Sequence, residues 1–185
     1  NYTLPAIPYS QADLYDASSH LLTTSDATQR ELEVNEFVNK KGWFINLGTG
    51  GEKVLASPLI LNYRLFFTTY LPASASTSLC APPTGSSRAY LVELVNGNAV
   101  TDLDRDGNKE HEDRHADLKQ TGIAPETKIL IEDMLKPVVC LGTECTEIVD
   151  DGDECGSEFE CLAENLYGRF ERLQRSNWQT ENERQ

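Results

Sequence analysis

The hydrophobic and polar positions of this chain divide it into an irregular start, one helix and a series of short strands. Residues 1–25 carry prolines and a polar Ser/Thr run, which is typical of a segment without regular structure. Residues 27–40 then predict a helix, because Ser25 or Asp26 is a suitable N-cap and Gly42 a suitable stop. The predicted buried face of this helix consists of Val34, Phe37 and Val38.

Strand-like runs replace the helical pattern over residues 42–97. These runs are rich in aromatic and β-branched residues, and glycines and asparagines punctuate them. The predicted strands are 43–47, 52–61 (interrupted near Pro58), 64–71 and 87–95. Strands joined in succession in this way are typical of one antiparallel blade of a β-propeller or of part of a β-sandwich, and periodicity does not separate the two.

The rest of the chain predicts less regular structure. Two further strands are expected at 128–131 and 137–141. Residues 143–161 are acidic and rich in turn-forming residues, and a charged, amphipathic tail follows from residue 165. No internal repeat is evident, so the sequence predicts a mainly β chain with one short helix.

The chain is strongly acidic, with 30 Asp and Glu against 16 Lys and Arg and a formal net charge of −14. Nucleic acids and anionic membranes are therefore poor partners, since their phosphates need cationic contacts, whereas a metal cation is a suitable one. No stretch approaches the ~20 apolar residues of a membrane span. Residues 1–20 also lack the basic and apolar regions of a signal peptide, and we expect the numbering to begin inside a longer precursor.

Five cysteines, at positions 80, 140, 145, 155 and 161, indicate the redox compartment. Zinc would favour a CxxC pair or a nearby histidine, and the cysteine-rich segment 140–161 has neither. We therefore expect disulfides and an exported, oxidising environment. The number is odd, so one cysteine is free or pairs outside the chain. Cys80 is the first candidate by sequence distance, although it can equally reach the C-terminal group in space.

The segment DLDRDGNKEHED at 102–113 is a candidate calcium loop. Its acids alternate, so three carboxylates point inward when the chain curls around an ion, and Gly107 supplies the sharp turn. The predicted ligands are Asp102, Asp104, Asp106, the backbone carbonyl of Asn108, Glu110 and, at the twelfth position, Asp113. We prefer Glu110 as the closing ligand, because an Asp at the twelfth position reaches less far than the usual Glu.

Two alternatives to calcium concern the same loop. The first is a solvated Asp/Gly-rich hairpin, which would leave the three carboxylates to repel one another. The second is magnesium, which suits the loop less because it keeps its waters and prefers a strict octahedron. We expect calcium to have a structural role, and a regulatory role is the second possibility.

No residue pattern indicates catalysis. The three histidines are His20, His111 and His115, and the last two do not form the HExxH motif of zinc proteases. No GxSxG motif is present, and the glycine-rich residues 48–51 lead into a strand rather than the helix that a phosphate site needs. The sequence thus predicts a protein that is not an enzyme.

The order of several short segments along the chain is more specific than any one of them. In the central region they are GWFINL at 42–47, GEKVL at 51–55, FFTTYLP at 66–72, Cys80 and RAYLV at 88–92. DLYDA at 13–17 precedes them, and the acidic loop, GIAPE at 122–126 and RSNW at 175–178 follow. Together they resemble the C-terminal propeller of the PilC/PilY family of type IV pilus tip-associated proteins. The resemblance covers nearly the whole chain, so residues 1–185 are interpreted as a C-terminal portion of such a propeller.

This resemblance implies a quinoprotein-like β-propeller in a large exported protein, which passes the periplasm and outer membrane to the cell surface. Such proteins lie at the pilus tip with minor pilins and support pilus extension, twitching motility and attachment to host or abiotic surfaces. The family's calcium loop corresponds to Asp102, Asp104, Asp106, Asn108 and Glu110. The chain departs from the family at Ala124, where a proline is frequent, in the cysteine-rich segment 140–161, and in lacking the N-terminal half with its von Willebrand A-like region.

Two other functions remain open at this point. A quinone-dependent dehydrogenase has the same propeller shape, but it needs converging Trp, Arg and acidic ligands that this fragment does not show. A structural filament subunit would instead use edge strands to pair with neighbouring subunits. Quinone absorbance of the purified protein tests the first, and the copy number in native pili tests the second.

Overall fold

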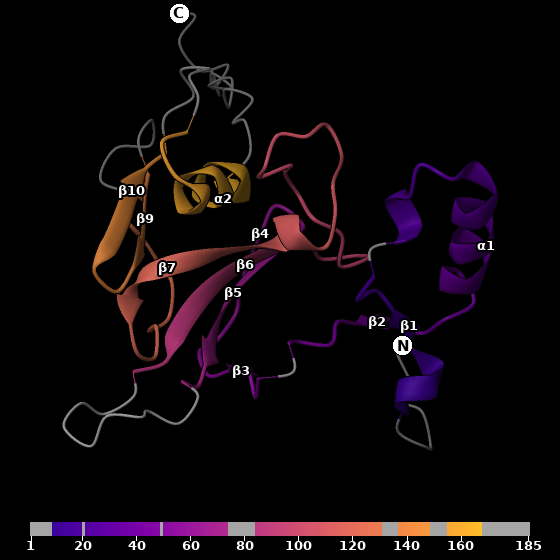
Figure 1. Ribbon diagram of the computed structural model, residues 1–185, viewed down its shortest axis with the longest axis horizontal. Coiled ribbons are helices and arrows are strands. Elements are labelled where there is room, and N and C mark those ends of the chain that lie inside the picture. The colour runs from indigo at the N-terminus through magenta and orange to yellow at the C-terminus, as the bar shows by residue number, and fades with distance from the viewer. Residues whose placement is uncertain are drawn as a thin grey trace, which may run out of the picture.

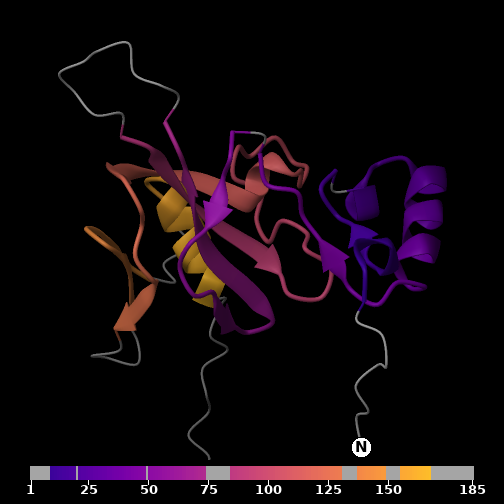
Figure 2. The same cartoon turned by 90° about the horizontal axis from the view of Figure 1, so that it is seen from below.

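The computed structural model describes residues 9–19, 21–48, 50–73, 84–130, 137–148 and 155–167, which are arranged around one central sheet (Figure 1). Helix α2 (Glu158–Tyr167) lies across one face of this sheet. A smaller sheet lies at one end, and a group of N-terminal elements lies at the other end (Figures 1 and 2). We call this group, residues 9–47, the N-terminal lobe.

The central sheet is antiparallel throughout. Its strands are β3 (Lys53–Val54), β4 (Leu59–Leu61), β5 (Arg64–Leu71), β6 (Ser86–Glu93) and β7 (His115–Thr121). Their order is β3-β5-β6-β7, and β4 pairs with β5 on the same edge as β3. Asn62 and Tyr63 both have positive φ, which is the backbone conformation that closes the tight hairpin between β4 and β5.

The mainly β class is confirmed, but one predicted strand lies elsewhere. The run 43–47 contributes only β2 (Trp43–Phe44), which pairs in parallel with β1 (Tyr15–Asp16) inside the lobe. The outer position in the central sheet belongs instead to β7, which the sequence pattern did not indicate. The sheets of the described residues do not close on themselves, so the propeller stays a prediction.

One face of the central sheet and one side of α2 form the main hydrophobic core. Every second residue of a strand points to the same face, so half of the side chains of β5, β6 and β7 meet the helix. The buried residues here include Phe66, Ala89, Leu91, Ala116 and Leu118 from the sheet and Phe159, Leu162, Ala163 and Leu166 from the helix. Burial of each large apolar side chain contributes about 1.5–3 kcal/mol.

The expectation of one short helix is wrong, because the described residues contain two α-helices. The second, α2, begins inside the segment that was interpreted as turn-rich. Its apolar residues follow the i, i+3, i+4, i+7 spacing of a single helix face. Burial of that face against the sheet, rather than the acidic composition around it, determines the local structure.

Helix α1 (Ala27–Phe37) begins at the predicted cap. The Asp26 carboxylate accepts hydrogen bonds from the backbone N–H groups of Thr28 and Gln29. The predicted buried face is wrong, however: no residue of α1 is buried, and Val34 and Val38 are 43% and 66% exposed. Local capping therefore determines where the helix begins, and the helix contributes little to the core.

The N-terminal lobe is held together by contacts of Tyr15. The ring of Phe37 packs edge-on against the ring of Tyr15, with the two centroids 5.5 Å apart. The Tyr15 hydroxyl donates a hydrogen bond of 2.8 Å to Glu33. Two short 3-10 turns, η1 (Gln11–Asp13) and η2 (Leu21–Thr23), complete the lobe.

The smaller sheet is antiparallel and has the order β10-β9-β8. Its strands are β8 (Lys128–Leu130), β9 (Val138–Leu141) and β10 (Glu144–Glu147), so both strands predicted in this region are present. Val139 and Leu141 of β9 are fully buried in the main core. The smaller sheet is thus part of the same folded unit as the central sheet.

Two disulfides confirm the expectation of paired cysteines. Cys140 and Cys145 lie opposite each other in the β9–β10 register and are bonded. Cys155 bonds to Cys161 and ties the start of α2 to the segment before it. Cys80 lies outside the described residues. The bonded pairs exclude the zinc interpretation of these four cysteines.

Candidate metal centre

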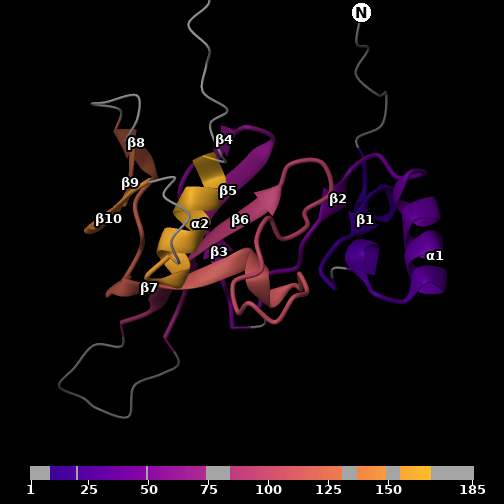
Figure 3. The same cartoon turned by 90° about the horizontal axis from the view of Figure 1, so that it is seen from above.

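The acidic loop lies between β6 and β7. It follows an isolated bridge between Val92 and Ala99 and ends in the 3-10 turn η3 (Glu112–Arg114), from which β7 continues directly. In Figure 3 the connection between β6 and β7 lies between α2 and the N-terminal lobe. The loop therefore sits where the lobe meets the rest of the fold.

Three of the predicted ligands come together in the loop. Asp102, Asp104 and Asp106 each offer a carboxylate oxygen, and these oxygens all lie within 4.8 Å of one another. Asp102 is half-buried, and the other two are exposed. Hard cations such as calcium bind clusters of oxygen ligands of this kind, so the donor set fits a divalent ion.

Backbone hydrogen bonds hold these carboxylates in place. Asp102 accepts the N–H groups of Arg105 at 2.7 Å and of Gly107 at 2.8 Å. Asp104 accepts the N–H of Asp106 in the same way. Arg105 and Gly107 have φ values of 60° and 95°, so the chain turns sharply at two alternate positions. These turns give the loop its curl around the three acids.

The electrostatics of the cluster favour a cation. The N–H of Asp106 lowers the pKa of Asp104, but desolvation and the negative charge of Asp106 outweigh this, and the pKa rises. Desolvation raises the pKa of Asp102, whereas the N–H groups of Gly107 and Arg105 lower it by more. The charge of Asp106 thus opposes ionisation of Asp104, and a bound divalent cation would offset that repulsion.

Asp113 has a different position from the three clustered acids. It is only 4% exposed, and its two oxygens accept the N–H of Leu103 at 2.7 Å and of Glu110 at 2.8 Å. One carboxylate therefore joins the beginning and the end of the loop. The side chains of Asn108 and Glu110 are exposed and do not belong to the three-carboxylate cluster.

The histidines next to the loop do not form a zinc site with each other. His111 pairs with Glu112 at 2.7 Å, whereas His115 begins β7 and stacks on Tyr90 with the ring centroids 5.0 Å apart. Burial and the nearby charge of Arg88 lower the pKa of His115. His20 lies outside the described residues.

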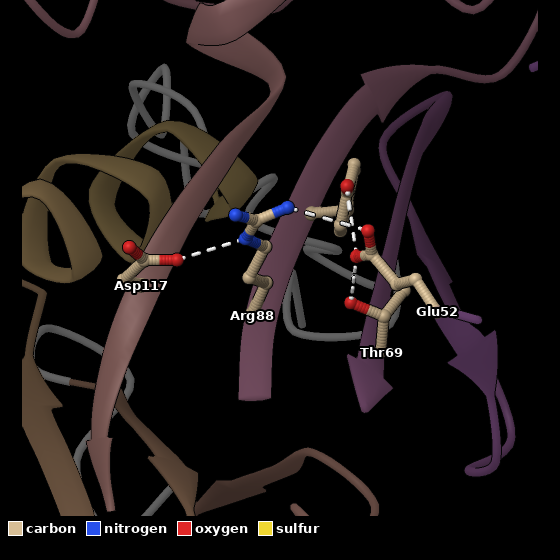
Figure 4. Close-up of polar contacts among 5 residues, drawn as sticks. Glu52, Thr69, Arg88 and Asp117 are labelled. Carbon is tan, nitrogen blue, oxygen red and sulfur yellow. Dashed lines mark hydrogen bonds and ion pairs between the residues drawn. The ribbon is translucent and has the colours of Figure 1, made fainter. Parts of the chain in front are cut away.

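A second polar cluster lies on the face of the sheet opposite α2 (Figure 4). The buried carboxylate of Glu52 accepts hydrogen bonds from the hydroxyls of Thr69 at 2.5 Å and Tyr90 at 3.0 Å. It also pairs with Arg88 at 3.2 Å, and Arg88 bonds to Asp117 at 2.9 Å. The network links the segment before β3 to β5, β6 and β7. Because both Glu52 oxygens already have partners, we interpret it as structural.

The sequence did not indicate this network, nor the buried position of Arg114. Arg114 is 2% exposed and bonds to backbone carbonyls of the N-terminal lobe. An arginine in a charged loop carries no local signal of burial. Only the tertiary contacts reveal it.

Comparisons with known proteins give one partial similarity. The chain is 30% identical, over 96 aligned residues, to a type IV pilus biogenesis factor PilY1 homolog of Xylella fastidiosa (strain Temecula1 / ATCC 700964). The alignment covers 48% of this chain and 6% of the relative, so the chain spans a small part of that protein. No protein family and no solved structure matches the sequence.

The two disulfides fit an extracellular or periplasmic protein. Within the described residues, every helix is too short or too polar to span a membrane.

Proposed function

We propose that this chain is a non-enzymatic, calcium-binding part of a type IV pilus biogenesis factor. It acts in an exported protein at the pilus tip, together with minor pilins, and supports pilus extension, twitching motility and surface attachment. The partial similarity to a PilY1 homolog supports the pilus role, and the disulfides support export. The propeller is the architecture we expect for the longer protein.

The observation that carries the calcium part of this proposal is the convergence of three carboxylates in one curled loop. Asp102, Asp104 and Asp106 would hold the ion, with the carbonyl of Asn108 and the Glu110 carboxylate completing the shell. Asp113 stays the predicted twelfth-position ligand, although its hydrogen bonds to both ends of the loop favour a positioning role. When bound, the ion supplies the positive charge that lets the acids lie side by side.

Calorimetry tests this assignment directly. Replacement of Asp104 and Asp106 by Ala should abolish calcium binding, because two of the three converging carboxylates are lost. The matched control is Glu31→Ala with Glu36→Ala on α1, which removes the same charge from exposed positions away from the loop. Equal affinity in the two double variants would show that the loop is not the site. Titration with magnesium in place of calcium measures the selectivity.

The pilus role is tested with the full-length protein in the cell that makes it. A strain carrying Asp104→Ala and Asp106→Ala should assemble fewer surface pili and spread less by twitching than a strain with the α1 control. Quantitative mass spectrometry of purified pili separates a tip protein, present in few copies, from a filament subunit, present in many. A copy number equal to that of the major subunit would contradict the proposal.

A further inference from the structure

The acidic loop is joined to the N-terminal lobe through a buried arginine. Arg114 donates hydrogen bonds from Nη1 to the carbonyl oxygen of Ser18 at 3.1 Å and from Nη2 to that of Ala17 at 2.5 Å. These partners lie 96 and 97 positions earlier in the chain. Burial lowers the pKa of Arg114 to about 10, so the group is still charged at neutral pH. A buried cation therefore depends on these two carbonyls for much of its hydrogen bonding.

The two carbonyls belong to a part of the lobe that carries its internal pairing. The N–H of Ala17 donates to the Phe44 carbonyl, and the N–H of Tyr15 donates to that of Gly42, both at 2.9 Å. Arg114 thus bonds to the two residues directly after β1, and β1 pairs with β2. A second, weaker contact also joins the lobe to the acidic loop. The Thr23 hydroxyl lies 3.5 Å from the carbonyl oxygen of Lys109.

The placement of Arg114 depends in turn on the shape of the loop. Arg114 follows Asp113 within the single turn η3, and both residues are buried. Asp113 accepts the N–H group of Leu103, which lies between Asp102 and Asp104, and that of Glu110, which follows the cluster of acids. If the loop expands, these two hydrogen bonds lengthen and η3 shifts. The guanidinium then moves with it, away from Ala17 and Ser18.

We propose that cation binding by the acidic loop is coupled to docking of the N-terminal lobe through Asp113 and Arg114. This inference rests on the proposed function of the loop as a calcium site. Without the ion, the repulsion among Asp102, Asp104 and Asp106 opens the loop and loosens the lobe. Because coupling between two sites is reciprocal, loss of the Arg114 contact also weakens calcium binding.

Hydrogen exchange of the 185-residue chain, with calcium chloride or with chelator, tests the first direction. Chelation should speed exchange of the Tyr15 and Ala17 amides about tenfold, and leave the β5–β6 amides unchanged. The amides of Gly107 and Asn108 report on the loop itself. A response in the loop without one in the lobe would overturn the coupling and leave the calcium site standing. No response in either place would overturn the calcium site as well.

The Arg114→Lys variant tests the reverse direction. Lysine keeps the charge but lacks the fork that reaches two carbonyls, so the calcium affinity should fall about tenfold. Arg30→Lys is the control, because Arg30 donates to the Thr24 carbonyl at 2.9 Å wholly within the lobe. Unchanged affinity in a folded Arg114→Lys variant would contradict the proposal. If that variant does not fold, the exchange experiment on the unmodified chain decides.

Discussion

Helices α1 and α2 are nearly equal in length but differ in how much of their surface is buried in the fold. α1 has 11 residues, a well-formed cap at Asp26 and no buried residue. α2 has 10 residues and buries Phe159, Leu162, Ala163 and Leu166 against the central sheet. The contrast teaches that capping determines where a helix begins, whereas an apolar face determines whether the fold depends on it.

Shortening one aliphatic side chain of each helix to Ala should give the largest difference in stability. Leu162 is fully buried, so Leu162→Ala should lower the free energy of unfolding by about 3 kcal/mol through lost burial and a new cavity. Val34 is 43% exposed, so Val34→Ala on α1 should change it by less than about 0.5 kcal/mol. Urea unfolding measures both. Similar losses would show that α1 is part of the core after all.

A smaller effect is expected from the disulfide that closes the start of α2. Replacement of Cys155 and Cys161 by Ala should lower the free energy of unfolding by about 2 kcal/mol, because the reduced chain gains conformational freedom. The Cys140→Ala/Cys145→Ala variant removes, from the smaller sheet, a disulfide that closes a loop of similar size. Thermal melts of both variants with and without reductant compare them. A melting temperature that reductant does not lower in the unmodified chain would contradict a stabilising role for either bond.

The same contrast explains which parts of the fold the sequence could predict. The cap of α1 and the span of β5, predicted at 64–71, depend on neighbouring residues, and both were predicted. α2 was missed because acidic residues separate its apolar positions and conceal their spacing. β7 was missed for a related reason, since only Ala116 and Leu118 face the core and charged residues alternate with them.

In the candidate metal centre, too, the sequence predicts what depends on neighbouring residues and not what depends on distant contacts. The alternating acids at 102, 104 and 106 predict their own convergence, because the signal lies within five consecutive residues. The positions of Asp113 and Arg114 depend on contacts that span the loop or nearly a hundred residues. No local pattern encodes such contacts. Arg114 therefore becomes visible only in the folded chain.

The smallest effect on stability is expected at the α1 cap. Whether this effect is local to α1 or global tells more than its size. Asp26→Ala leaves the N–H groups of Thr28 and Gln29 without their carboxylate partner, and should destabilise the helix by about 1 kcal/mol. Since no residue of α1 is fully buried, the loss should appear as faster amide exchange within α1, while the urea midpoint of the whole chain barely moves. Asp26→Asn keeps a capping oxygen and is the control. A global loss as large as that of Leu162→Ala would mean that the lobe and the sheet unfold as one unit, and that capping alone can hold a core element in place.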